Sequence, residues 1–173
     1  MRELYRPPHQ SPSPTKAAPA RMEPSPHTAP PVPFTRTVPA RLEEIPPMTE
    51  ALAEWAEAAG VPPRTMASVS LMVDELVANI VTHGYGATGA GDVRLEACIE
   101  DDKLVLLLTD HAFAFDPLQA PPPDTTSSLE DREIGGLGVH FVRRMADEVS
   151  YRRTAGTNEL RIVKRLASPA PRG

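Results

Sequence analysis

The sequence TMASVSLMVDELVANIVTH, residues 65–83, decides the fold. Its apolar residues recur at helical spacing and form a broad stripe, as expected for a helix that packs one face on a core. The stripe consists of Met66, Val69, Met72, Val73, Leu76, Val77 and Ile80. The pattern therefore predicts a helix over residues 65–83 that belongs to the core of the domain.

Three polar side chains follow one edge of this stripe. At roughly 100° per residue, Glu75, Asn79 and His83 fall within about 80° of one another. Asp74 points to the opposite, solvent side. A carboxylate, an amide and an imidazole in such a row would line the floor of a pocket between helix and sheet, and the alternative is a half-solvated boundary row. For His83, packing at the helix end beside Gly84 is favoured over a place in the site.

Upstream of this helix, the sequence predicts one strand and one further helix. Residues 34–38 alternate as a half-buried strand does, and Pro39 closes the strand. Residues 42–59 carry apolar side chains at helical spacing, and Gly60 follows the end. Pro46-Pro47 falls in the first turn, where a missing N–H costs little.

Downstream, two adjacent strands are expected over residues 93–99 and 104–109, separated by a turn. The run LVLLL at residues 104–108 is continuous rather than alternating, which indicates a central strand buried on both faces. Residues 111–133 show no periodicity and predict a long loop, and long loops in compact domains are usually functional.

The last part of the chain predicts a helix and a hairpin. Gly135-Gly-Leu-Gly138 opens a helix over residues 139–146. Strands over residues 148–153 and 158–166 follow, joined by a turn at Ala155-Gly156. Hairpins mixed with helices indicate the α+β class, with helices packed on one face of a largely antiparallel sheet.

Composition limits the class of protein. The 173 residues contain no apolar run near the roughly 18 residues that a membrane span needs. The amino-terminal MRELYRPPHQ lacks the apolar stretch of a secretory signal, so we expect a soluble, cytoplasmic protein without membrane contact. Cys98 is the only cysteine, which excludes an internal disulfide and a cysteine-based zinc site.

Charge and proline content divide the chain. Residues 1–33 hold 10 of the 21 prolines and few large apolar side chains, so we expect a disordered tail, either a spacer or a docking arm. This tail carries four Lys/Arg and two acids, a net charge of +2. Because the whole chain has a net charge of −5, the remaining residues carry −7. An acidic domain argues against direct nucleic-acid binding. The expected domain spans residues 34–167, and residues 168–173 form a frayed end.

Two further features suit a ligand that carries an amino group and phosphates. Asp110 ends the buried strand, where a lone acid can accept a hydrogen bond from a ligand at the mouth of a sheet–helix cleft. The Gly135–Gly138 turn would direct unpaired N–H groups and the positive end of the following helix at phosphate. Taken singly, an aspartate at a strand end is often a cap and such a glycine run is often only a turn.

In combination, these residues resemble the GHKL (histidine-kinase-like) ATPase superfamily. The run Asp74-Glu-Leu-Val-Ala-Asn79 with His83-Gly84 resembles its N-box, Asp110-His-Ala-Phe-Ala-Phe115 its first glycine box, and Gly136-Leu-Gly138 its second. The segments Phe115-Asp-Pro117, Leu129-Glu-Asp-Arg132 and 135–151 resemble its anti-sigma-factor serine/threonine kinase branch. The resemblance runs in order over residues 34–166, which makes it more specific than any one motif.

The resemblance implies a fold, two cofactors and a set of site residues. The fold is a two-layer α/β sandwich, the Bergerat ATP-binding fold, with a largely antiparallel mixed sheet and about three helices on one face. The cofactors are ATP and Mg²⁺, with Glu75 as general base or water-positioning residue and Asn79 as the Mg²⁺ ligand. Asp110 accepts from the adenine amino group, and residues 111–138 form a lid over the phosphates. The implied nucleotide-binding residues are Asn79, Asp110, Ala112, Phe115, Gly136, Leu137, Gly138 and Thr157.

The sequence departs from the family pattern at two positions. The first glycine box normally reads Asp-x-Gly, whereas this chain has Ala112, whose methyl group would crowd a bound base. The late strand of the family offers a hydroxyl near adenine. Thr157 lies close to that position, but Asn158 also fits the alignment.

Three functional hypotheses follow. The first is an ATP-dependent serine/threonine kinase that acts as an anti-sigma factor, binds a sigma factor, phosphorylates a STAS-type antagonist protein and forms a homodimer, as the resemblance implies. The second is a non-catalytic partner-binding module in which Ala112 weakens the nucleotide pocket. A third, ATP hydrolysis as a gated dimer switch, usually needs a further domain. A two-component histidine kinase is disfavoured because His140 lies in the helix after the lid rather than in a substrate helix.

Overall fold

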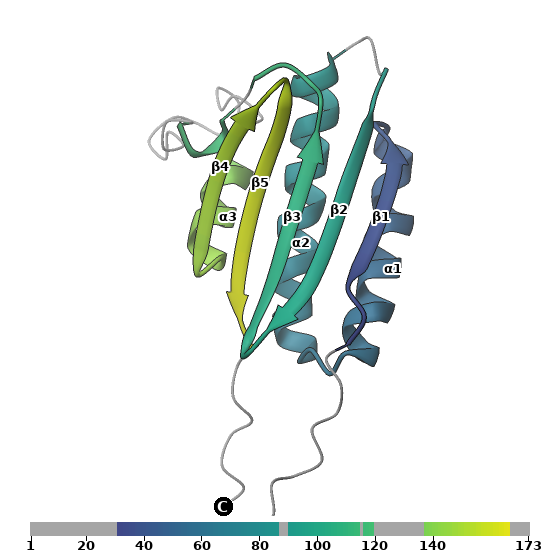
Figure 1. Ribbon diagram of the computed structural model, residues 1–173, viewed down its shortest axis with the longest axis vertical. Helices are drawn as coiled ribbons and strands as arrows, with labels where there is room; N and C mark the ends of the chain where they lie inside the picture. Colours follow the sequence, from purple (N-terminus) through teal and green to yellow (C-terminus); the bar gives the residue numbers. More distant parts are fainter. Residues whose placement is uncertain (1–30, 87–89, 115, 120–136, 167–173) are drawn as a thin grey trace, which may run out of the picture.

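The computed structural model describes residues 31–86, 90–114, 116–119 and 137–166. Most of the expected tail and the expected frayed end at residues 168–173 lie outside this part of the chain. The described residues form two layers, a sheet and a layer of helices (Figure 1). The strands are β1 (Phe34–Pro39), β2 (Asp92–Glu100), β3 (Lys103–Asp110), β4 (Glu148–Thr154) and β5 (Thr157–Arg165). The α-helices are α1 (Ile45–Ala58), α2 (Pro63–Asn79) and α3 (Leu137–Met145).

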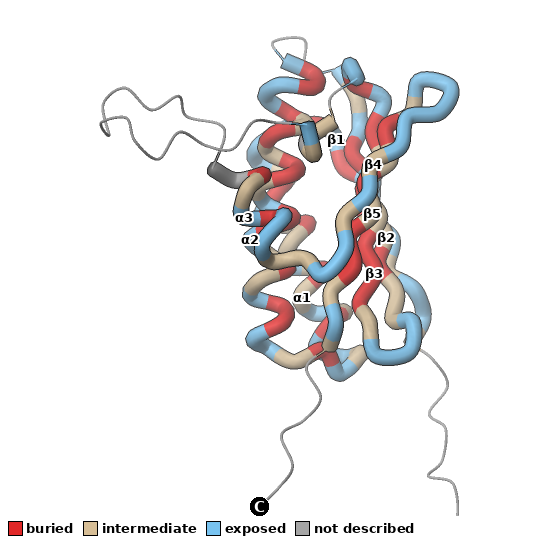
Figure 2. The backbone as a smooth tube through the Cα atoms, turned by 90° about the vertical axis from the view of Figure 1, so that its left-hand side faces the viewer, coloured by how far each residue is buried: buried red, intermediate tan, exposed pale blue. Residues whose placement is uncertain are grey.

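The sheet has the strand order β1-β2-β3-β5-β4, and every neighbouring pair is antiparallel. Helices α1, α2 and α3 all cover the same face of this sheet, with α2 packed against both of the others (Figures 1 and 2). The predicted α+β class, with helices on one face of a largely antiparallel sheet, is confirmed. No parallel pair occurs among the described strands, so this part of the sheet is not mixed.

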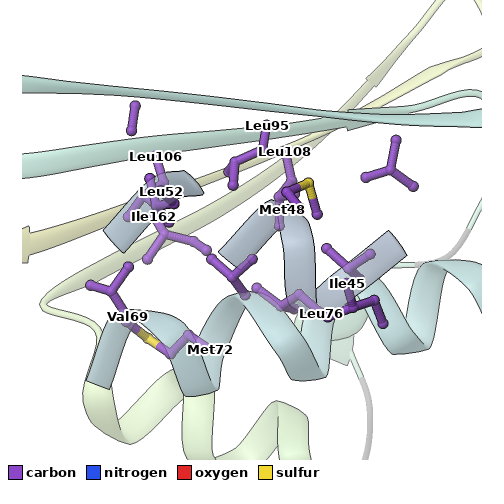
Figure 3. Close-up of a cluster of buried hydrophobic side chains, with 14 of the residues drawn as sticks. Ile45, Met48, Leu52, Val69, Met72, Leu76, Leu95, Leu106, Leu108 and Ile162 are labelled. Carbon is purple, nitrogen blue, oxygen red and sulfur yellow. The ribbon is translucent and has the colours of Figure 1, made fainter. Parts of the chain in front are cut away.

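The core fills the space between sheet and helices. Figure 3 shows side chains from α1 and α2 meeting those of β2, β3 and β5. Alternate residues of each strand point into this layer because successive side chains of a strand face opposite ways. The fully buried side chains include Met48, Leu52, Val69, Met72, Val73, Leu95, Leu104, Leu106, Leu108 and Ile162. The predicted apolar stripe of residues 65–83 therefore forms a large part of the helical side of the core, together with side chains of α1.

Strand β3 is central, as its continuous apolar run predicts, but it is fully buried only on the helical face and partly buried on the other. Leu104, Leu106 and Leu108 face the helices and are completely buried. On the face without helices, Val105 is also buried and pairs with the buried Val163 of β5.

The structure differs from the predicted helix 65–83 at its C-terminal end, next to Asn79. Helix α2 ends at Asn79, and the chain continues as a π-helical turn over Ile80–Tyr85. In a π-helix each hydrogen bond spans five residues rather than four, so residues after Asn79 leave the 100° register. This local widening cannot be read from apolar spacing. It removes His83 from the predicted row with Glu75 and Asn79, and His83 is exposed.

The continuous helical stretch Pro63–Tyr85 is long enough to cross a membrane, and its most apolar window has a mean hydropathy of 1.3. The stretch is interrupted by the charged side chains of Asp74 and Glu75, so it contains no uninterrupted apolar run of about 18 residues, as the sequence indicates. Half of that window is buried inside the described fold, as in the core helix of a soluble protein. The helix packs on the sheet through its apolar stripe.

Replacement of Leu106 by alanine tests the central position of β3. Leu106 is 0 % exposed in the middle of the core, so we expect Leu106→Ala to lower the free energy of unfolding by roughly 2–5 kcal/mol. Leu71 is 49 % exposed, and Leu71→Ala should cost much less. Denaturant unfolding followed by circular dichroism gives both values, and equal losses would contradict the assigned core.

Candidate functional site

A cavity of about 400 Å³, part of it open solvent, lies between α2 and the sheet at the end of β3. Its apolar wall comes from Leu76 and Ile80 on the helical side and Leu160 on β5. Three polar side chains also line it, Asn79, Asp110 and Asn158. The N-terminus of α3 lies at this same end of the molecule (Figure 1). The sequence-predicted Asn79 and Asp110 are thus brought to one cavity from distant parts of the chain.

Asn79 and Glu75 form a hydrogen-bonded pair on α2. The Nδ2 of Asn79 donates to Oε1 of Glu75 at 3.0 Å, as the spacing of four residues on a helix allows. Asn79 is only 7 % exposed. Its amino group is turned toward Glu75, which leaves the carboxamide oxygen for another partner. A single amide oxygen of this kind suits Mg²⁺ when phosphates and water supply the other ligands.

Glu75 does not line the same cavity as Asn79. It lines an adjacent hollow of about 200 Å³ between α2 and α3, together with Leu71, Phe141 and other apolar side chains. The Asn79–Glu75 hydrogen bond therefore links two neighbouring spaces. The Glu75 carboxylate thus lies at the boundary between the cavity and the hollow.

Asp110 is held by two donors on one of its oxygens. The backbone N–H of Ala112 and the Nδ2 of Asn158 donate to Oδ1 at 2.9 and 2.8 Å. Neither of these bonds uses Oδ2. Because Asp110 is 5 % exposed and lines the cavity, a ligand amino group can bind at the second oxygen.

Asn158 is the centre of a larger polar cluster. Its Nδ2 also reaches the carbonyl oxygens of Ala112 and Phe113, at 3.4 and 3.2 Å. Its Oδ1 accepts from the hydroxyl of Tyr151 at 2.7 Å and from the guanidinium of Arg153. Arg153 Nη1 further donates to the carbonyl of Ala112 at 2.9 Å. The cluster joins the ends of β3, β4 and β5 and fixes the backbone just after Asp110.

Ala112 packs against Gly84 of the π-helical turn. A Cβ atom added to Gly84 would lie 2.9 Å from the Cβ of Ala112, closer than such atoms approach in proteins. The methyl group that replaces the family glycine therefore occupies space that residue 84 leaves empty. Ala112 also lines the cavity. That its methyl group would crowd a base bound in the cavity stays a prediction.

Tyr85, the last residue of the π-helical turn, ties that turn to β2 and to the residue after β3. Its hydroxyl donates to the carbonyl of Asp92 at 2.9 Å and accepts from the N–H of His111 at 3.0 Å. Burial raises the pKa of Tyr85 above its ordinary value, and the Asp110 carboxylate adds to the effect. A Cβ at Gly91 would lie 2.1 Å from the tyrosine ring, so this position requires glycine.

The remaining sequence-predicted site residues have different places. Thr157 does not line the described cavity, and by strand alternation its side chain lies on the opposite face of β5 from Asn158. Leu137 and Gly138 form the first turn of α3. Phe115 and Gly136, with most of the expected lid, lie outside the described residues.

Sequence reasoning missed Tyr151, Arg153 and Phe113, which complete the site. Strand pairing gives a signal that could have found the first two. Asp110 is the last residue of β3 and pairs with Asn158, which in turn pairs with Arg153. Tyr151 lies two residues earlier on the same face of β4. For Phe113 the sequence carries no such signal.

Comparison with known families gives one match over most of the chain. The family described as "Histidine kinase-like ATPase domain" matches residues 38–164. This chain belongs to that family. Its similar curated relatives fall in the anti-sigma-factor serine/threonine kinase branch, as the motifs predict.

Three curated relatives illustrate the similarity of this ATPase domain. Serine/threonine-protein kinase BtrW of Bordetella bronchiseptica is 30 % identical over 58 % of this chain and 70 % of its own length. Serine-protein kinase RsbW of Listeria monocytogenes is 27 % identical over 67 % of this chain and 76 % of its own. The anti-sigma F factor of Pasteuria penetrans is 32 % identical over 58 % and 69 %.

Solved structures show the same fold for the ATPase domain. The RsbU and RsbW domains of Rv1364c from Mycobacterium tuberculosis superpose with a TM-score of 0.59 at 20 % identity, over 80 % of this chain. This chain spans about a third (34 %) of that structure. The SiaB–SiaC complex from Pseudomonas aeruginosa gives 0.53 at 18 % identity, over 76 % of this chain and 88 % of the other.

The Gly84–Ala112 contact predicts a compensating pair of substitutions. Gly84→Ala should destabilise the ATPase domain because its new methyl group meets Ala112 at 2.9 Å. Adding Ala112→Gly removes the obstructing methyl and should restore most of the lost stability. Thermal unfolding of the single and double variants measures this coupling. Additive losses would show that the two methyl groups do not meet.

Proposed function

We propose that this protein is an ATP-dependent serine/threonine kinase that acts as an anti-sigma factor. It phosphorylates a STAS-type antagonist protein and, in its other binding state, holds a sigma factor. The observation that carries the proposal is the Asn79–Glu75 hydrogen bond of 3.0 Å, which sets a metal-binding amide and a carboxylate side by side at the junction of two spaces. The family and the names of the relatives support it.

The cavity suits the base of ATP. A purine presents flat apolar faces and an exocyclic amino group, and the cavity offers apolar walls from Leu76, Ile80 and Leu160 beside the Asp110 carboxylate. Asp110 would accept the amino hydrogen bond through Oδ2, since Oδ1 already receives two donors. The phosphates would then extend toward Asn79 and the N-terminus of α3, whose unpaired N–H groups, that of Gly138 among them, attract anions. Leu137 lies in the same turn, and Phe115, Gly136 and the rest of the lid would complete this half of the site.

The residues present fit a magnesium ion bound together with ATP. The described residues hold no cluster of three or more His, Cys, Asp or Glu side chains that would bind a metal by itself. Mg²⁺ commonly uses one or two protein oxygens with substrate phosphates and water, and Asn79 offers one such oxygen. Bound there, the ion would neutralise charge on the transferred phosphoryl group.

Glu75 would act as the general base. Its carboxylate takes the proton from the serine or threonine hydroxyl of the partner as that oxygen forms a bond to the γ-phosphorus. The bond between the γ-phosphorus and the β–γ bridging oxygen breaks, and ADP leaves with that oxygen. Asn79 holds Glu75 through Oε1, so Oε2 is the oxygen that remains for the proton. The hollow between α2 and α3 would admit the hydroxyl-bearing segment.

The proposal extends to assembly and location. The resemblance favours a homodimer in the cytoplasm, with the sigma factor and the antagonist as alternative protein partners. The acidic character of the chain favours protein partners over direct contact with nucleic acid.

The second candidate function is a partner-binding module without transfer activity. Ala112 favours it, because its methyl group stands in the cavity wall where the family has glycine. Thr157 also fails to supply the hydroxyl that the family places near adenine. Calorimetric titration with ATP and Mg²⁺ separates the two functions, since the module would give no heat at millimolar nucleotide.

Glu75→Gln tests the kinase. The amide keeps the shape and a hydrogen bond to Asn79 but cannot take a proton, so we expect phosphate transfer to the antagonist to fall by about 10²–10⁴-fold. ATP affinity should stay close to that of the wild type. Transfer is measured with radiolabelled ATP and affinity by calorimetry.

Asp74→Asn is the matched control for Glu75→Gln. It makes the same chemical change one residue earlier, on an exposed carboxylate that accepts a hydrogen bond from Thr49. Transfer should continue at the wild-type rate. Unchanged transfer in Glu75→Gln would remove Glu75 from the mechanism, and an equal loss in both variants would point to a general charge effect.

A further inference from the structure

Phe113 combines two properties that seldom occur together. It lines the cavity beside Asp110 and Asn158, yet it remains 79 % exposed. The large exposed hydrophobic side chains of the described residues are Val32, Leu42, Leu71, Phe113 and Phe141, and among these Phe113 alone lines this cavity. An aromatic ring left open beside a cavity gains by contact with whatever binds there.

The backbone that carries Phe113 is held from two sides. Its N–H points to the carbonyl of Gly84 at 3.4 Å, and its own carbonyl accepts from Asn158 at 3.2 Å. One residue earlier, the carbonyl of Ala112 accepts from Arg153 at 2.9 Å. The ring is therefore presented from a fixed segment, so contact with a ligand costs little ordering of the backbone.

The surroundings select the base of a nucleotide as the part that meets this ring. The carboxylate of Asp110, next to Phe113, repels phosphate and accepts from an amino group. The same cavity is also lined by the apolar side chains of Leu76, Ile80 and Leu160. A flat aromatic ligand with an exocyclic amino group satisfies both features, because its edge bonds Asp110 while its faces meet apolar surface.

We propose that Phe113 is a specificity residue that covers the purine base of the bound nucleotide, stacked on the face opposite the apolar wall. This rests on the proposed function, since it assumes that the cavity binds ATP. Arg153 is a positioning residue, because it acts on the base only through the Ala112 carbonyl and Asn158. Asn158 holds Asp110 and the Phe113 carbonyl and also lines the cavity. The Ala112 methyl is accommodated against Gly84, and the aromatic ring supplies contact on the open side.

The test compares ligands with and without a base. Base–aromatic stacking is worth about 1–3 kcal/mol by alanine substitution, so Phe113→Ala should weaken ATP binding by about 5- to 140-fold. Binding of inorganic tripolyphosphate, which has no base, should stay unchanged. Phe113→Trp should keep the ATP affinity. Calorimetry in the presence of Mg²⁺ provides all of these constants without relying on transfer activity.

Leu42→Ala is the control, because Leu42 is 48 % exposed and lines neither the cavity nor the hollow. It should leave both affinities unchanged. An equal loss of ATP and tripolyphosphate affinity in Phe113→Ala would overturn the stacking role. So would an unchanged ATP affinity, or a loss confined to binding of the antagonist protein.

A fluorescence measurement checks the position of the ring directly. Trp55 is the only tryptophan, so Phe113→Trp in a Trp55→Phe background carries a single indole at the cavity. ATP should change its emission and tripolyphosphate should not. Arg153→Ala should weaken ATP binding severalfold, and Arg153→Lys should recover part of it by donating to the Ala112 carbonyl.

The outcomes separate this inference from the proposed function. A wild-type protein that binds ATP and transfers phosphate, together with a Phe113→Ala variant of the same affinity, overturns the role of Phe113 and leaves the kinase intact. A wild-type protein that binds no ATP overturns both. Loss of affinity in Phe113→Ala with the wild-type transfer rate at saturating ATP supports both.

Discussion

The hydrogen bond between Asp110 and Asn158 is the contact on which the site depends. A carboxylate that is 5 % exposed is costly unless donors meet it, and here one side-chain amide and one backbone N–H do so at a single oxygen. The same amide donates to the carbonyl groups of Ala112 and Phe113. The ends of β3, β4 and β5 and the start of the following segment are thereby joined in one network. The second carboxylate oxygen of Asp110 and the ring of Phe113 take no part in these hydrogen bonds, and both residues line the cavity.

Helix α2 contributes to the core through its apolar face and to the candidate site through its polar edge. Its apolar stripe supplies much of the helical side of the core, and its polar edge supplies Asn79 and Glu75 (Figure 3 shows part of the stripe). Rigid burial of the stripe fixes the rotation of the helix, so the position of the polar edge follows from packing. The π-helical turn after Asn79 then releases the chain from that register, which lets Gly84 approach Ala112 and Tyr85 reach the ends of β2 and β3. Because one helix sets both core and site, disturbance of either is expected at the other.

The sequence predicts the two layers and part of the candidate site, and the reasons are physical. Apolar spacing identifies α2 and β3 because burial forces a period on the side chains that face the core. Glu75 and Asn79 lie four residues apart on one helix, so their contact follows from local geometry alone. The Asn158 cluster depends on strand pairing between residues 48 positions apart, which no local pattern encodes. For the same reason the sequence does not distinguish Thr157 from Asn158 as the cavity residue, since a shift of one residue along a strand exchanges its two faces. The sequence does not predict the π-helical turn, because apolar spacing does not distinguish this turn from the α-helix that it continues.

The contact between Gly84 and Ala112 restricts the routes by which this protein can diverge. Only one of the two positions has room for a methyl group, since a second Cβ would come within 2.9 Å of the first. A lineage that exchanges them must therefore lose the methyl at position 112 before it gains one at position 84. The reverse order passes through a strained intermediate that selection for stability removes. The departure from the family glycine is thus tied to a second site in the chain, and its tolerance in a relative should depend on what stands at the position of Gly84.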